Sequence, residues 1–274
     1  IGPVPGMKNY WVAVGVMAGF CQGGGVGKCI AEWIIDGEPS IDVWAMDVAR
    51  FGDYASPQYG TIKSSENYER RFIMTFPNET LPKGRKQKTT ALYDRFVNQG
   101  AVMGDSFGLE NVLWFANNKE DAHEEPTIKR SRSHDYVSKE VINVRENVGL
   151  IEVANFSKHE FKGPDARKFL DHIMAGRLPK PGRISLSPML SYRGKLCGDL
   201  TVACLDENEF MVFGSGAAQE MHRRWFESHL GKFNLSYSNR SDEYHGLSIA
   251  GPNSRKVLEK IVRDDVSNEK FKFR

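Results

Sequence analysis

The sequence has no apolar run long enough to cross a membrane. Its longest apolar stretch, residues 10–20, is about eleven residues long, whereas a membrane-spanning helix needs about twenty. No basic region followed by an apolar core appears at its start, as a secretory signal would require. The first residue is not methionine, and we therefore expect the chain to begin inside a larger protein.

Cysteine is scarce and scattered. Cys21, Cys29, Cys197 and Cys204 form no C-x-x-C pair, and no cluster of cysteine and histidine has zinc spacing, so the sequence predicts no structural metal. Scattered cysteines in a chain of this length are typical of reduced thiols in a cytosol-like compartment. None of the seven histidines lies near a G-x-S-x-G nucleophile motif, which favours structural or surface roles for them.

A large excess of charge of either sign is also missing. The 37 basic side chains against 35 acidic ones leave a net charge of +2, which gives no indication of a nucleic acid or an acidic membrane as partner. Hydrophobic residues make up 40%, and the glycines bring the apolar share to about half, the usual range of globular proteins. A chain of 274 residues can bury a sizeable core and suggests about two domains.

Hydrophobic patterns predict mixed helices and strands. Residues 9–16 are typical of a buried strand, a glycine cluster follows at 23–27, and a helix is predicted over 28–36 with its stop at Gly37. Strands are further predicted over 69–77, 150–156, 184–190, 199–205 and 209–214, with helices over 91–101, 136–147, 166–174 and 217–230. Several strands are consecutive, which favours an α+β fold over a doubly wound parallel sheet.

The glycine cluster does not complete a nucleotide-binding motif. A Walker A loop would need glycine and Ser/Thr where the sequence has Gln22 and Cys29, and the dinucleotide fingerprint would need glycine at Lys28. A tight strand-to-helix turn would explain the cluster on structural grounds alone. A glycine-only backbone at a helix N-terminus would also let a planar or anionic ligand approach free N–H groups closely.

The first fifty residues carry a family resemblance. The runs I-G-P-V-P-G-x-x-N-Y-W-V-A-x-G, G-G-G-x-G-K-x-x-A-E-W-I-x-x-G-E-P and D-V-x-R-F resemble the C-terminal end of the FAD domain in dimethylglycine and sarcosine dehydrogenases and oxidases. In that family the glycine loop lies against the flavin ring. The resemblance therefore implies that the FAD-binding positions of this sequence are Phe20, Cys21, Gln22, Gly23, Gly24 and Gly25.

The remaining sequence agrees in order with the same family. Residues 53–115 resemble its central domain, with Leu109 where the family usually has Trp. From residue 116 on, V-R-E-N-V-G-L, P-M-L-S-x-R-G-K-x-x-x-D-L-T-V and G-L-S-I-A-G-P-N-S-R-x-V-L resemble the first half of a glycine-cleavage T-protein, an aminomethyltransferase that binds tetrahydrofolate. We therefore expect three segments, over 1–52, 53–115 and a truncated folate-binding domain over 116–274.

Asp199 is the candidate catalytic residue. A carboxylate between a loop and a strand is commonly solvated or a turn acceptor. The resemblance instead places Asp199 beside the reacting nitrogen of the folate, where a carboxylate can accept the proton lost when that amine attacks an iminium carbon or formaldehyde. Thr201, two residues along the same strand, and Gly214 match further folate-contacting positions. The sequence departs from the folate-binding pattern at three positions, namely Leu186, Ser191 and Lys195.

The resemblance implies a flavin-dependent N-methylamine dehydrogenase, with FAD and tetrahydrofolate as cofactors. Its substrate would be dimethylglycine or sarcosine, and its electron acceptor would be oxygen or an electron-transfer flavoprotein. The protein would lie in the cytoplasm of a bacterium or in the mitochondrial matrix of a eukaryote, and the fragment alone is expected to be inactive. Two alternatives stay open: a T-protein-like aminomethyltransferase with a vestigial oxidase segment, and a non-catalytic folate-binding module.

Overall fold

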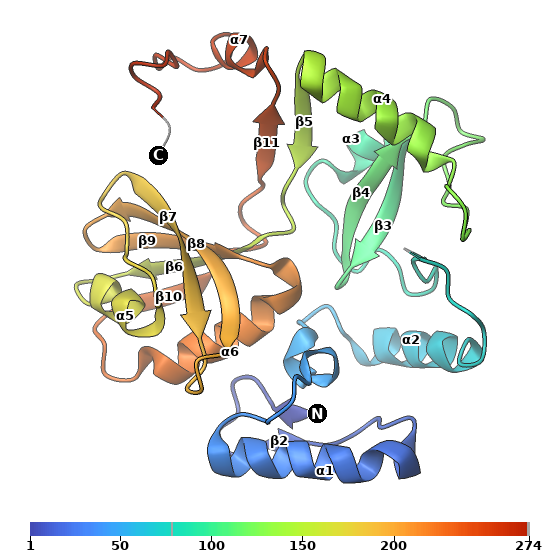
Figure 1. Cartoon of the computed structure of the whole chain (residues 1–274), viewed down its shortest axis with the longest axis vertical. Helices are drawn as coiled ribbons and strands as arrows, with labels where there is room; N and C mark the ends of the chain where they lie inside the picture. Colours follow the sequence, from blue (N-terminus) through green and yellow to red (C-terminus); the bar gives the residue numbers. More distant parts are fainter. Residues whose placement is uncertain (78, 273–274) are drawn as a thin grey trace. The chain divides into compact units, whose positions relative to one another are not determined.

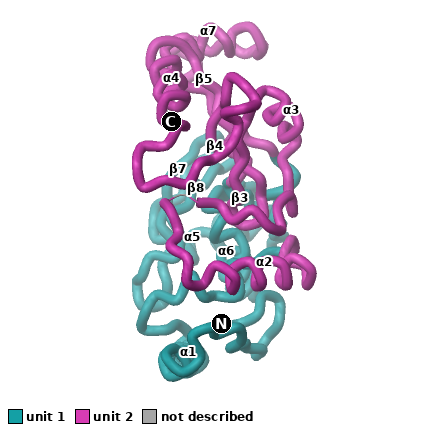
Figure 2. The backbone as a smooth tube through the Cα atoms, turned by 90° about the vertical axis from the view of Figure 1, so that its right-hand side faces the viewer, with its two compact units in different colours: residues 1–52, 156–244 teal, residues 53–155, 245–274 magenta. Residues whose placement is uncertain are grey.

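The computed structural model describes residues 1–77 and 79–272. Contacts divide the chain into two compact units, each made of two stretches of sequence (Figure 2). The first unit comprises residues 1–52 and 156–244, and the second comprises 53–155 and 245–274. Helices occur together with antiparallel strand pairs in both units, so the predicted α+β class is confirmed.

The first unit is built around a five-stranded antiparallel sheet with the strand order β10-β6-β9-β8-β7 (Figure 1). Consecutive strands β7, β8 and β9 form a meander, and β6 joins it from an earlier point in the sequence. The strands are β6 (Ser157–Lys162), β7 (Arg183–Leu190), β8 (Leu196–Asp206), β9 (Glu209–Gly214) and β10 (Ser236–Asn239).

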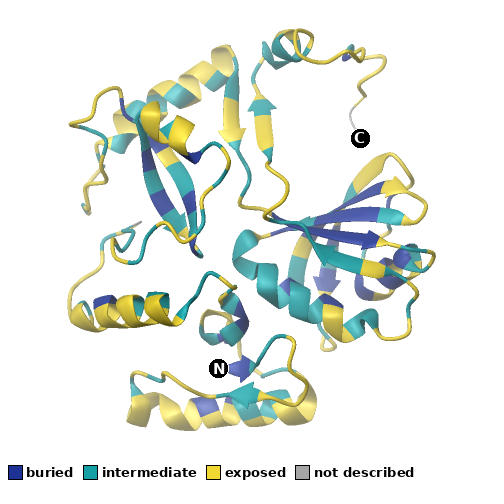
Figure 3. Ribbon diagram, turned by 180° about the vertical axis from the view of Figure 1, so that it is seen from behind, coloured by how far each residue is buried: buried dark blue, intermediate teal, exposed yellow. Residues whose placement is uncertain are grey.

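One face of this sheet forms the core with helices α5 (Ala166–Ile173) and α6 (Gln219–Leu230). Figure 3 shows the central strands in dark blue, the colour of buried residues. Leu200 and Val202 of β8 are fully buried in this core. Because successive side chains of a strand point to opposite faces, Asp199 and Thr201 lie on the other face of the sheet.

Residues 1–52 complete the first unit with a long helix, α1 (Gly19–Asp36). It buries Val26 and Cys29, three residues apart on one helical face, in a small core of its own. The helix ends as predicted, with Gly37 in the left-handed region at φ 84°. The shorter elements of these residues are β1 (Gly2–Pro3), β2 (Trp11–Val12), η1 (Trp44–Met46) and η2 (Val48–Arg50). A further 3₁₀ turn, η3 (Gly216–Ala218), leads into α6.

Two expectations for these residues are wrong. Strand pairing is limited to β2, which is two residues long, rather than 9–16. The helix begins at Gly19 rather than at residue 28, so the glycine cluster lies inside the helix and is not a turn before it. The glycines of this cluster have no positive φ, and without a proline in the stretch nothing interrupts the helical hydrogen bonds.

The second unit contains two small antiparallel sheets, β3-β4 and β11-β5, and four helices among its described residues. Trp114 and Val102 form the centre of its small core, beside which the Arg85 guanidinium pairs with the buried Glu110 carboxylate. Its elements are α2 (Pro57–Glu69), α3 (Tyr93–Asn98), β3 (Ala101–Ser106), β4 (Leu109–Phe115), α4 (Ser133–Glu146), β5 (Gly149–Glu152), β11 (Leu247–Ala250) and α7 (Ser254–Leu258).

The strand predicted over 69–77 is also wrong. Residues 70–73 form a turn after α2, and Phe72 and Met74 are exposed, so the apolar pattern there buries nothing within the described residues. The strand expected at 150–156 corresponds only to β5, and β6 was not anticipated. The polar run Ser157-Lys158-His159-Glu160 does not look like a core strand, yet pairing on both sides buries it.

The two compact units share only the boundary at 52/53 with the three segments expected from the sequence. The structure joins residues 1–52 with 156–244, because the oxidase-like N-terminal stretch contacts α6 and the tip of the β7–β8 hairpin of the T-protein-like region. Among the described residues, no helix combines the length and apolar character that crossing a membrane requires.

Candidate functional site

The outward side of α1 presents a shallow hollow, widely open to solvent and lined mostly by glycines. Gly19, Phe20, Gly23 and Gly24 line it, whereas the other predicted flavin-binding residues, Cys21, Gln22 and Gly25, do not. These lining positions are spaced i, i+1, i+4 and i+5, which places them on one side of a helix. The structure therefore brings together three of the six residues predicted to bind flavin.

The described chain contains no steric reason for glycine at these positions. A Cβ atom added at Gly23 or Gly24 would meet no heavy atom within 4 Å. Each glycine inside a helix costs about 0.5–1 kcal/mol relative to alanine. The helix tolerates this cost at several positions. Phe20, which lies beside these glycines, is fully exposed. An outward-facing helix backbone without side chains would let a ligand or another protein segment approach it closely.

Asp199 and Thr201 lie together on the open face of the sheet, as the sequence predicts. Asp199 is the fourth residue of β8 rather than its first, because the strand begins at Leu196. Its side chain is exposed, and its cross-strand partner on β7 is Pro188. Thr201 pairs with Leu186 of β7. The carboxylate therefore stands on a mainly apolar sheet face, accessible to a small molecule.

Gly214 is explained by packing on the opposite side of the sheet. A Cβ atom there would lie 2.6 Å from Leu200 Cδ2 and 2.9 Å from His222 Nδ1. Gly198 has the same relation to this imidazole, because its Cβ would lie 2.9 Å from His222 Nε2. The structure thus places the Cα hydrogen side of Gly214 against the core and not beside the Asp199 side chain, and its contact with folate stays a prediction.

A buried polar cluster behind the sheet was not anticipated. His159 of β6 and Tyr237 of β10 share a hydrogen bond of 2.9 Å between Nδ1 and the hydroxyl oxygen. Burial, together with His222 and Arg223, lowers the pKa of His159 to about 3. Burial also lowers the pKa of His222, whose Nε2 lies 3.3 Å from the Cys197 carbonyl oxygen. Both imidazoles are therefore neutral near pH 7.

Acid should destabilise the protein through His159. Below pH 6.5 the unfolded chain takes up a proton at this residue, whereas the folded state does so only near its pKa of about 3. The free energy of unfolding should therefore fall as pH falls between these values, by up to about 1.4 kcal/mol per pH unit for this group. Urea unfolding over a pH series measures the slope. His159→Gln should give a shallower slope, and an unchanged slope would contradict the assignment.

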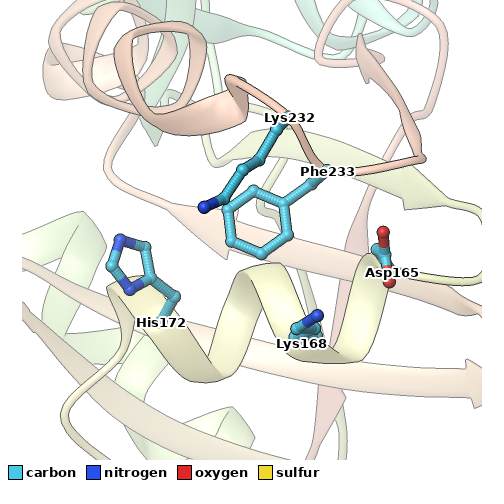
Figure 4. Close-up of a pocket in the computed structure, with 5 residues that line it drawn as sticks. All are labelled: Asp165, Lys168, His172, Lys232 and Phe233. Atoms are coloured by element: carbon cyan, nitrogen blue, oxygen red, sulfur yellow. The ribbon is translucent and has the colours of Figure 1, made fainter.

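A second pocket lies between α5 and the segment that follows α6 (Figure 4). Figure 4 shows the Lys232 nitrogen and His172 on one side of the Phe233 ring and Asp165 on the other, with Lys168 on the helix between them. The Asp165 carboxylate already accepts the Asn234 N–H at 2.9 Å. No residue predicted from the sequence lines this pocket, and it lies on the helix-covered side of the sheet, away from Asp199.

Comparison with known proteins finds both an oxidoreductase region and a T-protein-like region in this chain. Residues 92–274 match the GCVT N-terminal domain, and residues 36–90 match the FAD dependent oxidoreductase central domain. The chain belongs to the GCVT N-terminal domain family. The resemblance to dimethylglycine and sarcosine dehydrogenases is confirmed as well. The matched ranges put the start of the GCVT region at 92, whereas the sequence pattern predicts 116.

The similarity to several relatives extends over the whole chain. The chain is 35% identical to mitochondrial dimethylglycine dehydrogenase of Mus musculus, of which it covers 32%. It is 26% identical to mitochondrial sarcosine dehydrogenase of Homo sapiens, of which it covers 34%. The chain thus spans about a third of the length of these relatives. The solved aminomethyltransferase T of Bartonella henselae shares the fold over 63% of this chain and 43% of its own, with a TM-score of 0.53 and 23% identity.

Proposed function

We propose that this chain is part of a flavin-dependent dehydrogenase that demethylates dimethylglycine or sarcosine and passes the one-carbon unit to tetrahydrofolate. The observation that carries the proposal is the union, in one chain similar to dimethylglycine dehydrogenase throughout, of an oxidase-like segment and a folate-type sheet bearing Asp199. The similarity to mitochondrial proteins supports a mitochondrial location, which would be the matrix, if the source is eukaryotic. In a bacterium the protein would lie in the cytoplasm.

The oxidase side of the reaction would use the outward face of α1. Bound FAD would supply the hydride acceptor for the N-methyl group. Gly23 and Gly24 fit such a group because their backbone is open and no described side chain fills the space above it. The first turn of α1 would direct its positive end toward the flavin, although the N-terminus lies at Gly19, several residues before the centre of the glycine cluster.

The folate side would use the open face of the five-stranded sheet. The Asp199 carboxylate would accept the proton that the folate amine loses as it attacks the iminium carbon or formaldehyde. Thr201 on the same face would orient the ligand by its hydroxyl, while Leu186 opposite supplies apolar contact in place of the tyrosine common in the family. Free formaldehyde would be released when this capture fails.

The full-length protein tests the proposal directly. Anaerobic addition of dimethylglycine or sarcosine should bleach the flavin absorbance, and tetrahydrofolate should convert the released carbon to 5,10-methylenetetrahydrofolate. The rates at which oxygen and an electron-transfer flavoprotein reoxidise the reduced flavin identify the electron acceptor. Failure of both substrates to reduce the flavin, with folate binding intact, would favour a T-protein-like module with a vestigial oxidase segment.

Replacement of Gly24 by alanine should separate helix stability from flavin binding. Alanine removes the cost of glycine in a helix, so α1 should gain up to about 1 kcal/mol. The added methyl group would occupy the hollow, so flavin content of the purified full-length protein should fall. Gly27→Ala, at a helical glycine that is also open and is not among the predicted flavin-binding residues, is the matched control and should gain stability with full flavin. Full flavin in both variants would contradict contact at Gly24.

A further inference from the structure

The tip of the β7–β8 hairpin, residues 191–195, contacts the end of α1 within the first compact unit. The Arg193 guanidinium forms an ion pair with Asp36, at 3.0 Å between Nη2 and Oδ2. Its Nε lies 3.7 Å from the Glu38 carboxylate. Glu38 is only 13% exposed in its side chain, so this arginine provides the cation for a largely buried carboxylate. The hairpin is thus tied to the last residue of α1 and to the turn that follows.

Lys195 extends the same contact by one further anchor. Its ammonium group lies 3.2 Å from the Ser40 carbonyl oxygen and 3.4 Å from that of Pro39. The T-protein pattern has a glycine at position 195, and a glycine could not make either hydrogen bond. The departure from the pattern at Lys195 therefore adds a link between the hairpin and the oxidase-like segment.

The opposite side of the hairpin tip is held by α6. The Tyr192 ring packs on Trp225 with 5.3 Å between ring centroids, and its hydroxyl hydrogen-bonds His229 Nε2 at 2.9 Å. Within the hairpin, the Ser191 N–H donates to the Lys195 carbonyl oxygen at 2.8 Å. The tip is therefore fixed on both sides, and its position is defined by α1 on one side and α6 on the other.

This hairpin leads directly into β8, the strand that carries Asp199. Lys195 immediately precedes β8, and Asp199 lies four residues further on. We propose that Arg193 and Lys195 are positioning residues, which hold the hairpin on the end of α1 and so fix Asp199 relative to the helix that carries the glycine hollow. This inference rests on the proposed function, because only transfer between a flavin site and a folate site requires that relation.

The contacts of Arg193 and Lys195 with the end of α1 should restrain the hairpin locally and contribute little to the global free energy of unfolding. Arg193 and Asp36 are 41% and 43% exposed, and ion pairs of this exposure contribute little to the unfolding equilibrium. Several such contacts converging on one hairpin instead oppose its local opening. Their loss should leave the melting temperature nearly unchanged while the hairpin opens more often.

The test uses the full-length protein carrying Arg193→Gln together with Lys195→Gly. Hydrogen exchange of the amides over 191–196 should accelerate roughly tenfold, as expected when a few weak contacts are lost. The rate of flavin reduction should stay at the wild-type value, while the share of carbon recovered as methylenetetrahydrofolate falls several-fold and free formaldehyde rises. Arg193→Lys restores one cation and should recover part of the capture. Lys180→Gly, an exposed loop lysine away from α1, is the matched control.

Asp199→Asn measured alongside separates this inference from the proposed function. Loss of capture in Asp199→Asn together with normal capture in the double variant would overturn the positioning role and leave the function standing. Unchanged hairpin exchange would overturn it as well. Normal capture in Asp199→Asn would overturn the role of Asp199 as proton acceptor, and the positioning role with it. The proposed function itself would be overturned if the wild-type protein neither reduced its flavin with these amines nor formed methylenetetrahydrofolate.

Discussion

Asp199→Asn should abolish most folate coupling while amine oxidation continues. The substitution keeps the size of the side chain and its hydrogen-bonding capacity but removes its charge and basicity. Formation of methylenetetrahydrofolate should fall roughly 10²–10⁴-fold if the carboxylate accepts the folate proton. Folate affinity should change much less than turnover, because the lost interaction belongs to the reacting state. Stopped-flow flavin reduction and product analysis in the full-length protein measure the two steps separately.

Asp206→Asn is the matched control for this experiment. Asp206 ends the same strand, is also exposed, and lies far along β8 from the folate face proposed around Asp199. It should leave both flavin reduction and folate coupling unchanged. A solvated Asp199 with no role predicts the same neutral result for both variants. Equal loss of flavin reduction and coupling in Asp199→Asn would instead indicate misfolding.

Strand β8 is an example of what the sequence alone predicts well. In β8, apolar Leu200 and Val202 alternate with Asp199 and Thr201, and this period of two assigns the polar pair to one face without any tertiary information. The structure confirms the alternation. The pattern succeeds because one face of the strand packs on a core of helices and the other face does not.

The glycine cluster and β6 show where local pattern fails. The sequence does not reveal that Gly23 and Gly24 continue a helix, because glycine propensity argues against one and burial of Val26 and Cys29 decides otherwise. In β6 the local sequence gives even less indication of burial, because most of its residues are polar. His159 is buried because Tyr237, which is 78 residues away, provides its hydrogen bond, and no local window contains both partners.

The contact between the oxidase-like segment, residues 1–52, and helix α6 has the same long-range character. Arg224 of α6 and Asp47, which caps η2, are 177 residues apart. The two side chains form a bidentate pair, at 2.9 Å between Nη1 and Oδ1 and 2.6 Å between Nη2 and Oδ2. Arg224 also donates to the Pro3 carbonyl oxygen at 2.9 Å and lies over the Trp33 ring. One guanidinium thus joins three parts of residues 1–52 to α6.

Arg224→Met should destabilise this junction strongly. The Asp47 side chain is only 5% exposed. Without the guanidinium, the one hydrogen-bond donor left to its carboxylate within residues 1–77 and 79–272 would be the Ala49 N–H. Removing one partner of such a pair costs about 2–5 kcal/mol, since a buried charge is left uncompensated. Chemical unfolding measures the loss, and hydrogen exchange in α1 should accelerate as residues 1–52 separate from α6.

Arg223→Met is the control from the adjacent position on the same helix. Arg223 pairs only with Glu220 and Glu227 of α6 itself among the described ion pairs, and such intrahelical pairs contribute about 0.3–0.5 kcal/mol. Its loss should therefore be several-fold smaller and leave exchange in α1 unchanged. Asp47→Asn combined with Arg224→Met should recover part of the stability, because the uncompensated charge is then gone. Equal losses in the Arg223 and Arg224 variants would show that the pair with Asp47 does not hold the oxidase-like segment in place.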